Sequence, residues 1–109
     1  MAGLDADGTA EMSFDVAAAA GNGLTVRICG ELDITNVDAL EVAVSSALER
    51  HPARLIIDVS GLRFADSSAI ALWVRWSTAV HEIELRHVSP ILRRVIDTMG
   101  LADALNVKP

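Results

Sequence analysis

Strand-like and helix-like hydrophobic patterns alternate along this chain, and the alternation constrains its fold more than any other feature. The first two strand-like segments flank Gly21-Asn22-Gly23, whose residues tolerate the positive φ angles that a tight hairpin needs. We therefore expect an α/β fold of order β-β-α-β-α-β-α, in which helices pack on one mixed sheet of four to five strands. The two βα crossovers should be right-handed, which makes the strands that they connect parallel.

Four segments have the pattern of strands: residues 12–18, 24–29 and 54–59, and the segment in which Ile83 and Leu85 alternate with polar neighbours. The third segment contains the apolar run Leu55-Ile56-Ile57, which is typical of a central strand buried on both faces. Ser60-Gly61 is expected to end that strand.

Three segments have helical periodicity. The first should begin near Thr35, which can cap the helix with Asp38 in the position of a capping box. Residues 69–80 are apolar on nearly every side, which is typical of a buried helix. The last helix should begin at Ser89-Pro90 and end at Gly100. Its apolar stripe is expected to consist of Ile91, Leu92, Val95, Ile96 and Met99.

The length of 109 residues and a hydrophobic fraction of 51% predict one domain with a substantial core. Residues 1–11 are small and acidic, so we expect a flexible N-terminal tail followed by a domain over residues 12–109. No apolar run approaches the roughly 20 residues of a membrane span, and the N-terminus lacks the features of a signal peptide. These features predict a cytoplasmic protein that does not insert into a membrane.

The formal net charge of −6 and the absence of a basic block argue against nucleic acid as a partner. Cys29 is the single cysteine, so no internal disulfide can form. The three histidines have no metal-ligand spacing, and the sequence contains no Gly-rich phosphate loop or nucleophile elbow. The sequence therefore predicts neither a metal nor a cofactor, and it favours a binding protein over an enzyme.

Two short loops carry the candidate functional residues: Gly30-Glu31-Leu32-Asp33 and Ala65-Asp66-Ser67-Ser68-Ala69. Each follows a strand-like run and leads into a helix. If the two strands are neighbours, both loops lie at the same edge of the sheet and bring a serine at a helix start close to acidic side chains. Such a site is suited to control by phosphate, which adds a charge of about −1.5 to −2 and is favoured at a helix N-terminus.

These loops form part of a longer pattern. They are accompanied by Leu55-Ile56-Ile57-Asp58 and by Ser89-Pro90 followed by Val95-Ile96-Asp97-Thr98-Met99-Gly100-Leu101. In this order the segments resemble the STAS domain, and within it the bacterial anti-sigma factor antagonists. The resemblance runs from about Met12 to Val107, and Ala69 departs from it because the family usually has Gly there.

The resemblance implies a switch between partners. In that family, the unphosphorylated antagonist binds an anti-sigma factor that is also a serine kinase, and binding frees a sigma factor. The kinase phosphorylates the second serine of the Asp-Ser-Ser motif and the complex dissociates, until a serine phosphatase resets the cycle. The matching phosphoacceptor here is Ser68, and the acid that matches the family's partner contact is Asp33.

Several residues of the expected interface have alternative interpretations. Ser68 could be a plain N-cap, and Asp66 could either cap the helix or orient the Ser68 hydroxyl. Asp33 and Glu31 could be solvated turn residues, although the family pattern favours Asp33 as a partner contact and Glu31 as mainly structural. Ser67 belongs to the expected contact surface with Asp66.

Trp73 and Trp76 lie three residues apart on the helix that follows Ser68. Core packing explains such residues, whereas an exposed tryptophan beside the switch would be a candidate hot spot for a partner. Both are therefore included among the expected partner-binding residues.

Two other functions of a STAS domain fit the same sequence. One is a non-switching scaffold subunit of a stress-signalling assembly, and the other is the STAS subunit of a lipid-transport ATPase, which would bind a membrane permease. In the latter, Ser68 would be a structural cap or a contact.

Overall fold

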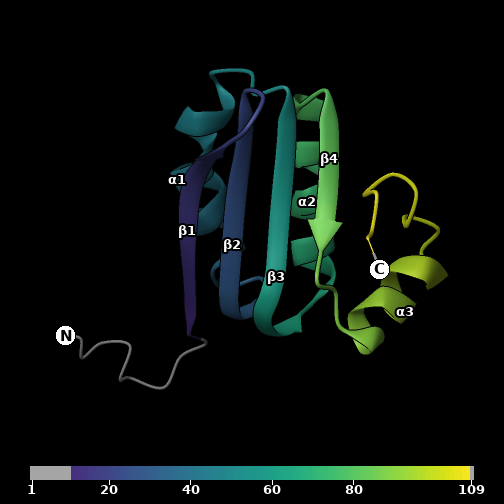
Figure 1. The fold of residues 1–109 in the computed structure, drawn as a ribbon. Coiled ribbons are helices and arrows are strands. Elements are labelled where there is room, and N and C mark those ends of the chain that lie inside the picture. Colours follow the sequence, from purple (N-terminus) through teal and green to yellow (C-terminus); the bar gives the residue numbers. More distant parts are fainter. Residues whose placement is uncertain (1–10, 109) are drawn as a thin grey trace.

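The computed structural model describes residues 11–108, which form one four-stranded sheet with three helices in the expected order (Figure 1). The expected tail over residues 1–11 lies outside the described residues, apart from Glu11. The elements are β1 (Met12–Ala19), β2 (Gly23–Leu32), α1 (Val37–Leu48), β3 (Arg54–Ala65), α2 (Ser67–Ala79), β4 (Glu82–Arg86) and α3 (Pro90–Thr98).

The strand order across the sheet is β1-β2-β3-β4. β1 and β2 form an antiparallel hairpin, and Gly21 and Asn22 in its turn have φ angles of 70° and 60°. β2 pairs with β3 and β3 pairs with β4 in parallel, which confirms the expected parallel pairing. The carboxyl ends of β2 and β3 consequently meet at one edge of the sheet, at the bottom of Figure 1, whereas the shorter β4 runs in the same direction and ends earlier, where Arg86 pairs with Asp58 in the strand register.

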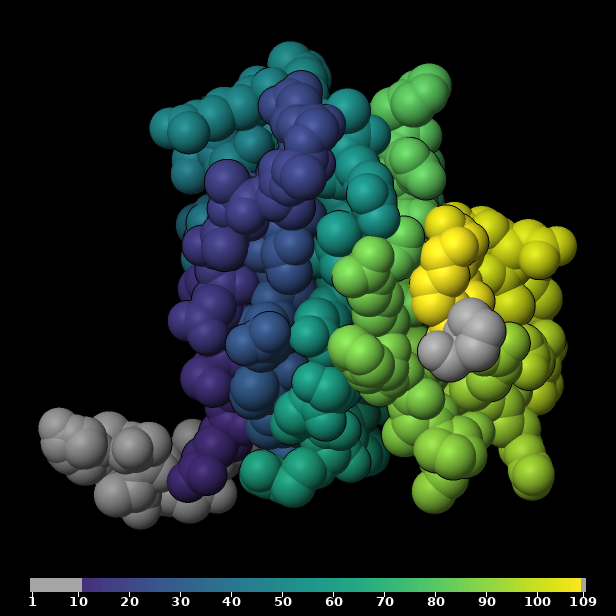
Figure 2. Space-filling view, in the orientation of Figure 1, coloured from purple at the N-terminus to yellow at the C-terminus, as the bar shows by residue number. Residues whose placement is uncertain are grey.

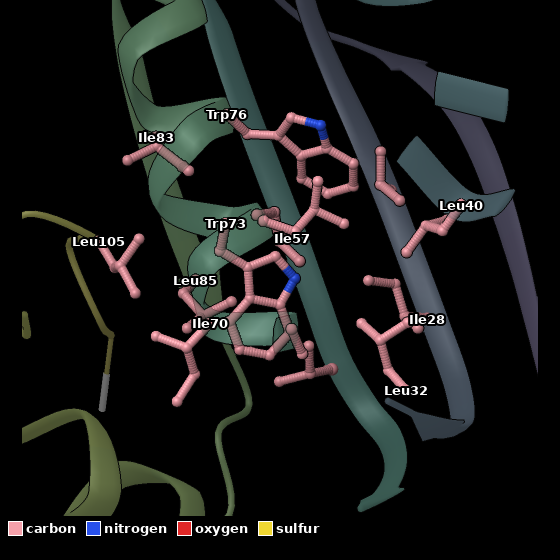
Figure 3. Packing of buried hydrophobic residues seen from close by; sticks show 14 of the residues in the cluster. Ile28, Leu32, Leu40, Ile57, Ile70, Trp73, Trp76, Ile83, Leu85 and Leu105 are labelled. Atoms are coloured by element: carbon pink, nitrogen blue, oxygen red, sulfur yellow. The ribbon is translucent and has the colours of Figure 1, made fainter. Parts of the chain in front are cut away.

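The hydrophobic core lies between the sheet and two helices. α1 and α2 cover one face of the sheet, behind it in Figure 1, while α3 lies beyond the β4 edge. Ile28 and Ile57 from the central strands meet Trp73 and Trp76 from α2 in this layer (Figure 3), and all four side chains are buried. α2 is therefore the buried helix that its apolar composition predicts.

No helix within residues 11–108 covers the opposite face, and the strands reach the surface there (Figure 2). This face nevertheless contains two buried carboxylates, Asp58 and Glu84. Glu84 pairs with Arg54 at 3.1 Å and with Arg86, and its pKa is lowered because these hydrogen bonds and charges outweigh desolvation. The arginines therefore compensate the burial of its charge.

Asp58 is the second of these carboxylates. It accepts hydrogen bonds from Ser60 N–H at 2.9 Å and from His87 Nδ1 at 3.0 Å, and it pairs with Arg27 at 3.4 Å. Desolvation alone would raise its pKa, but the hydrogen bonds with Ser60 and His87 lower the pKa to about 2. Asp58 is thus held as a carboxylate in the folded protein.

The prediction that Ser60-Gly61 ends the third strand is wrong, because β3 continues to Ala65. The register between β2 and β3 shifts beside this pair, as at a β-bulge, so the strand absorbs the irregularity and continues. A Cβ added at Gly61 would lie 2.6 Å from Cys29 Sγ, so a larger residue there would force the Cys29 side chain to shift.

The predicted capping box at Thr35 is also wrong. α1 begins at Val37 with Asn36 at the N-cap position and no side-chain cap. The Thr35 hydroxyl instead donates to Asp33 Oδ1 at 2.5 Å, which leaves it unavailable to the helix. The Asx-type turn of Asp33 competes successfully with the cap.

The start of the last helix is confirmed, since Ser89 Oγ accepts a hydrogen bond from Leu92 N–H at 3.2 Å and Pro90 opens α3. Its apolar stripe is only half buried. Leu92 and Ile96 face the core, whereas Ile91, Val95 and Met99 are exposed because α3 lies at the edge of the sheet and not across its face.

Candidate functional site

The two candidate loops meet at the carboxyl edge of the sheet, as their sequence positions predict. Asp66 N–H donates to the Leu32 carbonyl at 3.3 Å, and Ile34 N–H donates to Asp66 Oδ2 at 3.2 Å. The loop between β2 and α1 therefore touches the first turn of α2.

Asp66 is the N-cap residue of α2. Its Oδ1 accepts hydrogen bonds from Ser68 N–H at 2.9 Å, from Ala69 N–H at 3.4 Å and from the Ser68 hydroxyl. Of the two roles left open for Asp66, the geometry supports both, since the carboxylate caps the helix and orients the serine. The alternative that Ser68 is the N-cap is wrong, because Ser68 lies inside the first turn.

The electrostatics of Asp66 follow from these donors. Partial burial alone would raise the pKa of its carboxyl, but hydrogen bonds from the Ser68 hydroxyl and from the backbone of Ile34, Ser68 and Ala69 lower the pKa. Asp66 is thus ionised at neutral pH, and its negative charge complements the positive end of the α2 dipole.

Ser67 and Ser68 occupy the first turn of α2, where backbone N–H groups have no partner within the helix. Ser67 is exposed and Ser68 is half-buried. The Ser68 hydroxyl is the one bonded to Asp66, so the structure gives the two serines different surroundings.

Asp33 shapes the loop that follows β2. Its Oδ1 accepts from Thr35 N–H at 2.9 Å, and its carbonyl accepts from Val37 N–H at 2.9 Å. The Asn36 side chain completes the loop by accepting from Asp33 N–H at 3.0 Å and donating to the Glu31 carbonyl at 2.9 Å. The structural roles of Thr35 and Asn36 were not anticipated, although the pattern Asp-x-Thr-Asn is typical of an Asx turn.

Glu31 lies 3.8 Å from Arg63 across the strands, and both side chains are exposed. Such a surface ion pair contributes little to stability. Of the Asp33 carboxylate, only Oδ1 has a hydrogen-bond partner within residues 11–108.

The inclusion of Trp73 and Trp76 among the partner-binding residues needs correction. Both indoles are buried in the layer between α2 and the sheet, as Figure 3 shows. A partner could reach them only if the core opened, so they serve packing. Because α2 is apolar on nearly every side, its sequence does not indicate which face is exposed, and the packing of the helix against the sheet determines that face.

An apolar groove adjoins the serine site and was not predicted from the sequence. It has a volume of about 430 Å³ and runs between the end of β3 and α3. Phe64 is 51% exposed and Ile91 80% exposed, and Val95 also lines it. The groove reaches Ala65, the residue immediately before Asp66. The sequence feature that could have indicated the groove is the apolar stripe of α3, which is wider than the edge of the sheet can bury.

Within residues 11–108, no three His, Cys, Asp or Glu side chains are grouped so that they could hold a metal ion. None of the helices described there is long and apolar enough to cross a membrane.

The fold and the site define a small mixed-sheet α/β domain in which a serine bonded to the helix-capping Asp66 lies at the carboxyl edge of the sheet. Residues 16–107 match the family described as "Mlab, STAS domain". The chain therefore belongs to the STAS domain family.

Solved structures share this fold. An anti-sigma factor antagonist from Mycobacterium paratuberculosis has a TM-score of 0.82 at 22% identity, covering 91% of this chain and 86% of that one. The unphosphorylated anti-sigma factor antagonist SpoIIAA has a TM-score of 0.75 at 22% identity, covering 89% of each chain. The phosphorylated form of the Bacillus cell fate determinant SpoIIAA has a TM-score of 0.70 at 22% identity, covering 89% of this chain and 92% of that one.

Proposed function

We propose that this protein is an anti-sigma factor antagonist in the cytoplasm. It binds an anti-sigma factor that has serine kinase activity and releases a sigma factor, and phosphorylation of Ser68 by that kinase ends the complex. The observation that carries the proposal is the half-buried Ser68 hydroxyl, bonded to Asp66 at the sheet edge where the Asp33 loop also lies. The shared fold with anti-sigma factor antagonists, one of them solved with and without phosphate, supports it.

The fold should tolerate a phosphate on Ser68. The group would sit at the N-terminus of a 13-residue helix, where the helix dipole favours negative charge and where the N–H groups that now bond Asp66 can also bond a phosphate. Its effect should therefore fall on binding and not on folding.

Binding should be sensitive to the phosphate because the interface is already acidic. The modification adds a charge of about −1.5 to −2 beside Asp66 and the Asp33 loop. Burying or opposing such a charge costs several kcal/mol. Since about 1.4 kcal/mol corresponds to a tenfold change in affinity, we expect a loss of roughly a hundredfold or more.

The docking surface combines two parts. Asp33, Asp66 and Ser67 provide polar contacts, and the neighbouring groove with Phe64 and Ile91 provides the apolar centre that a stable interface needs. A serine with acidic neighbours alone would offer too little apolar surface for tight binding.

Intact-mass spectrometry after incubation with candidate anti-sigma kinases and ATP tests the proposal. One added phosphate that disappears in Ser68→Ala and persists in Ser67→Ala is the expected result. A protein that binds such a kinase but never gains phosphate would favour a non-switching scaffold. A protein that binds a membrane permease instead would favour the subunit of a lipid-transport ATPase.

A further inference from the structure

Asp66 connects the two loops of the site through its two carboxylate oxygens. Oδ1 holds Ser68 and the first turn of α2, while Oδ2 accepts the hydrogen bond from Ile34 N–H at 3.2 Å. One side chain thus links the proposed phosphoacceptor to the residue that directly follows Asp33.

The loop from Asp33 to Asn36 has few other ties to α2. Its own hydrogen bonds, between Asp33, Thr35 and Asn36, fix its shape, and Asn36 also ties it to the Glu31 carbonyl of β2. The backbone bond from Asp66 N–H to the Leu32 carbonyl at 3.3 Å anchors the chain just before Asp33, so the bond at Ile34 is the tie that reaches the loop itself. Packing does not hold Ile34, whose side chain is 71% exposed. Among the side-chain hydrogen bonds of residues 11–108, the one from Ile34 N–H to Asp66 is the direct tie between this loop and the start of α2.

We propose that Asp66 is a positioning residue that holds the Asp33 loop against α2, and that phosphate on Ser68 releases this loop. The inference rests on the proposed function for the source of the phosphate. It adds that modification of Ser68 acts on Asp33 through Asp66, as well as by its own charge.

The chemistry of the step explains the release. When Ser68 Oγ forms a bond to the γ-phosphorus of ATP, the bond from that phosphorus to the bridging oxygen breaks. ADP leaves with the electron pair, and the hydroxyl proton passes to solvent. Oγ then has no proton to donate to Asp66 Oδ1, and a phosphate anion competes for the N–H groups of Ser68 and Ala69. Repulsion between the two anions drives the carboxylate away from Ile34.

The variant Asp66→Asn separates the two roles of this side chain, namely the hydrogen bond to Ile34 N–H and the capping of α2. Asparagine is as good an N-cap as aspartate, so its oxygen can still accept from the first turn of α2. Its amide nitrogen would then face Ile34 N–H, and two donors cannot bond. The variant therefore removes the link to the loop and keeps the helix.

The test measures backbone amides by NMR in the isolated protein. Phosphoserine is incorporated during synthesis at position 68 or at position 67, so no kinase is needed. In Asp66→Asn and with phosphate on Ser68, the Ile34 amide proton should move upfield and exchange at least about fivefold faster, the factor for losing one modest hydrogen bond. The Thr35 amide, bonded within the loop to Asp33, should change little.

Phosphate on Ser67 is the matched control, since its hydroxyl has no hydrogen bond to Asp66 in the structure described. It should leave the Ile34 amide nearly as in the unmodified protein. An Ile34 amide that ignores Asp66→Asn or phosphate on Ser68 would overturn the inference, and so would an equal response to phosphate on either serine.

These amide measurements need no partner, so they separate the inference from the proposed function. A responsive Ile34 amide in a protein that binds no anti-sigma factor would refute the function and support the link. Where the partner does bind, Asp66→Asn should weaken the complex by about tenfold with an unchanged circular dichroism spectrum. Unchanged affinity in a variant with a released Ile34 amide would overturn the positioning role.

Discussion

Replacing Asp66 by alanine should destabilise the protein far more than replacing Ser68, because Asp66 is the residue that caps α2. Asp66→Ala removes the acceptor for Ser68 N–H and Ala69 N–H, and also for Ile34 N–H. Loss of an N-cap costs typically about 1 kcal/mol, and loss of a negative charge at a helix start costs roughly 0.3–1 kcal/mol.

With the exposed bond to Ile34 included, the free energy of unfolding should fall by about 2 kcal/mol. For a domain of this size, that corresponds to a decrease in Tm of roughly 10 °C. Ser68→Ala leaves the cap intact and removes only the hydrogen bond from the hydroxyl to Asp66, so it should cost about 0.5–1 kcal/mol. Ser89→Ala, at the N-cap of α3, should cost about 1 kcal/mol and serves as a reference for the loss of an N-cap alone.

Urea denaturation provides the assay, followed by circular dichroism and by the fluorescence of Trp73 and Trp76, which both lie buried on α2. The pKa of Asp66 is lowered by folding, so its contribution is fully present above the unfolded value of about 3.9 and is lost as the pH falls through the lower folded value. The difference between wild type and Asp66→Ala should therefore shrink below about pH 4. A Ser68→Ala variant as unstable as Asp66→Ala would show that Ser68 is the cap and refute this reasoning.

Three further predictions concern the fold and the groove. Gly30→Ala should cost about 3 kcal/mol or more in urea denaturation, since Gly30 has φ +93° and an added Cβ would lie 2.0 Å from the Glu11 carbonyl oxygen. Gly100→Ala, at φ +74° with no atom within 4 Å, should cost only about 1 kcal/mol, and equal losses would contradict the packing argument. Asp58→Asn should lower the free energy of unfolding by about 2 kcal/mol at pH 7. Thermal melts should show this difference from the wild type disappearing between about pH 4 and pH 2, as Asp58 becomes protonated. A difference that persists at about pH 2 would indicate a steric effect and contradict the prediction. Phe64→Glu should weaken anti-sigma factor binding at least about tenfold by calorimetry, whereas Val42→Glu, at a residue 72% exposed on α1, should change it little; equal effects would exclude the groove.

The order of elements and the parallel pairing could be predicted because each depends on local periodicity and on the handedness of crossovers. The meeting of the two loops at one edge follows from that topology. The end of β3 could not be predicted, because the bulge beside Gly61 depends on the approach of Cys29 from the neighbouring strand. A single sequence segment contains no information on that approach.

The site was predictable in its residue types but not in its hydrogen bonds. The motif indicated Asp66 and Ser68, whereas the choice of Asp66 as the cap and the tie to Ile34 depend on three-dimensional placement. Similarly, the stripe of α3 indicated an apolar face, but only the position of the helix beyond β4 explains why Ile91 and Val95 remain exposed.

Calorimetric titration of the anti-sigma partner tests the central claim most directly, with the protein unmodified and with phosphoserine at position 68. Phosphate should weaken binding by roughly a hundredfold or more while the circular dichroism spectrum stays native. Ser68→Ala should bind like the wild type, and Ser68→Glu should bind more weakly, although less so than the phosphorylated protein because it adds a single charge. Equal affinities for the unmodified and phosphorylated forms would contradict the account.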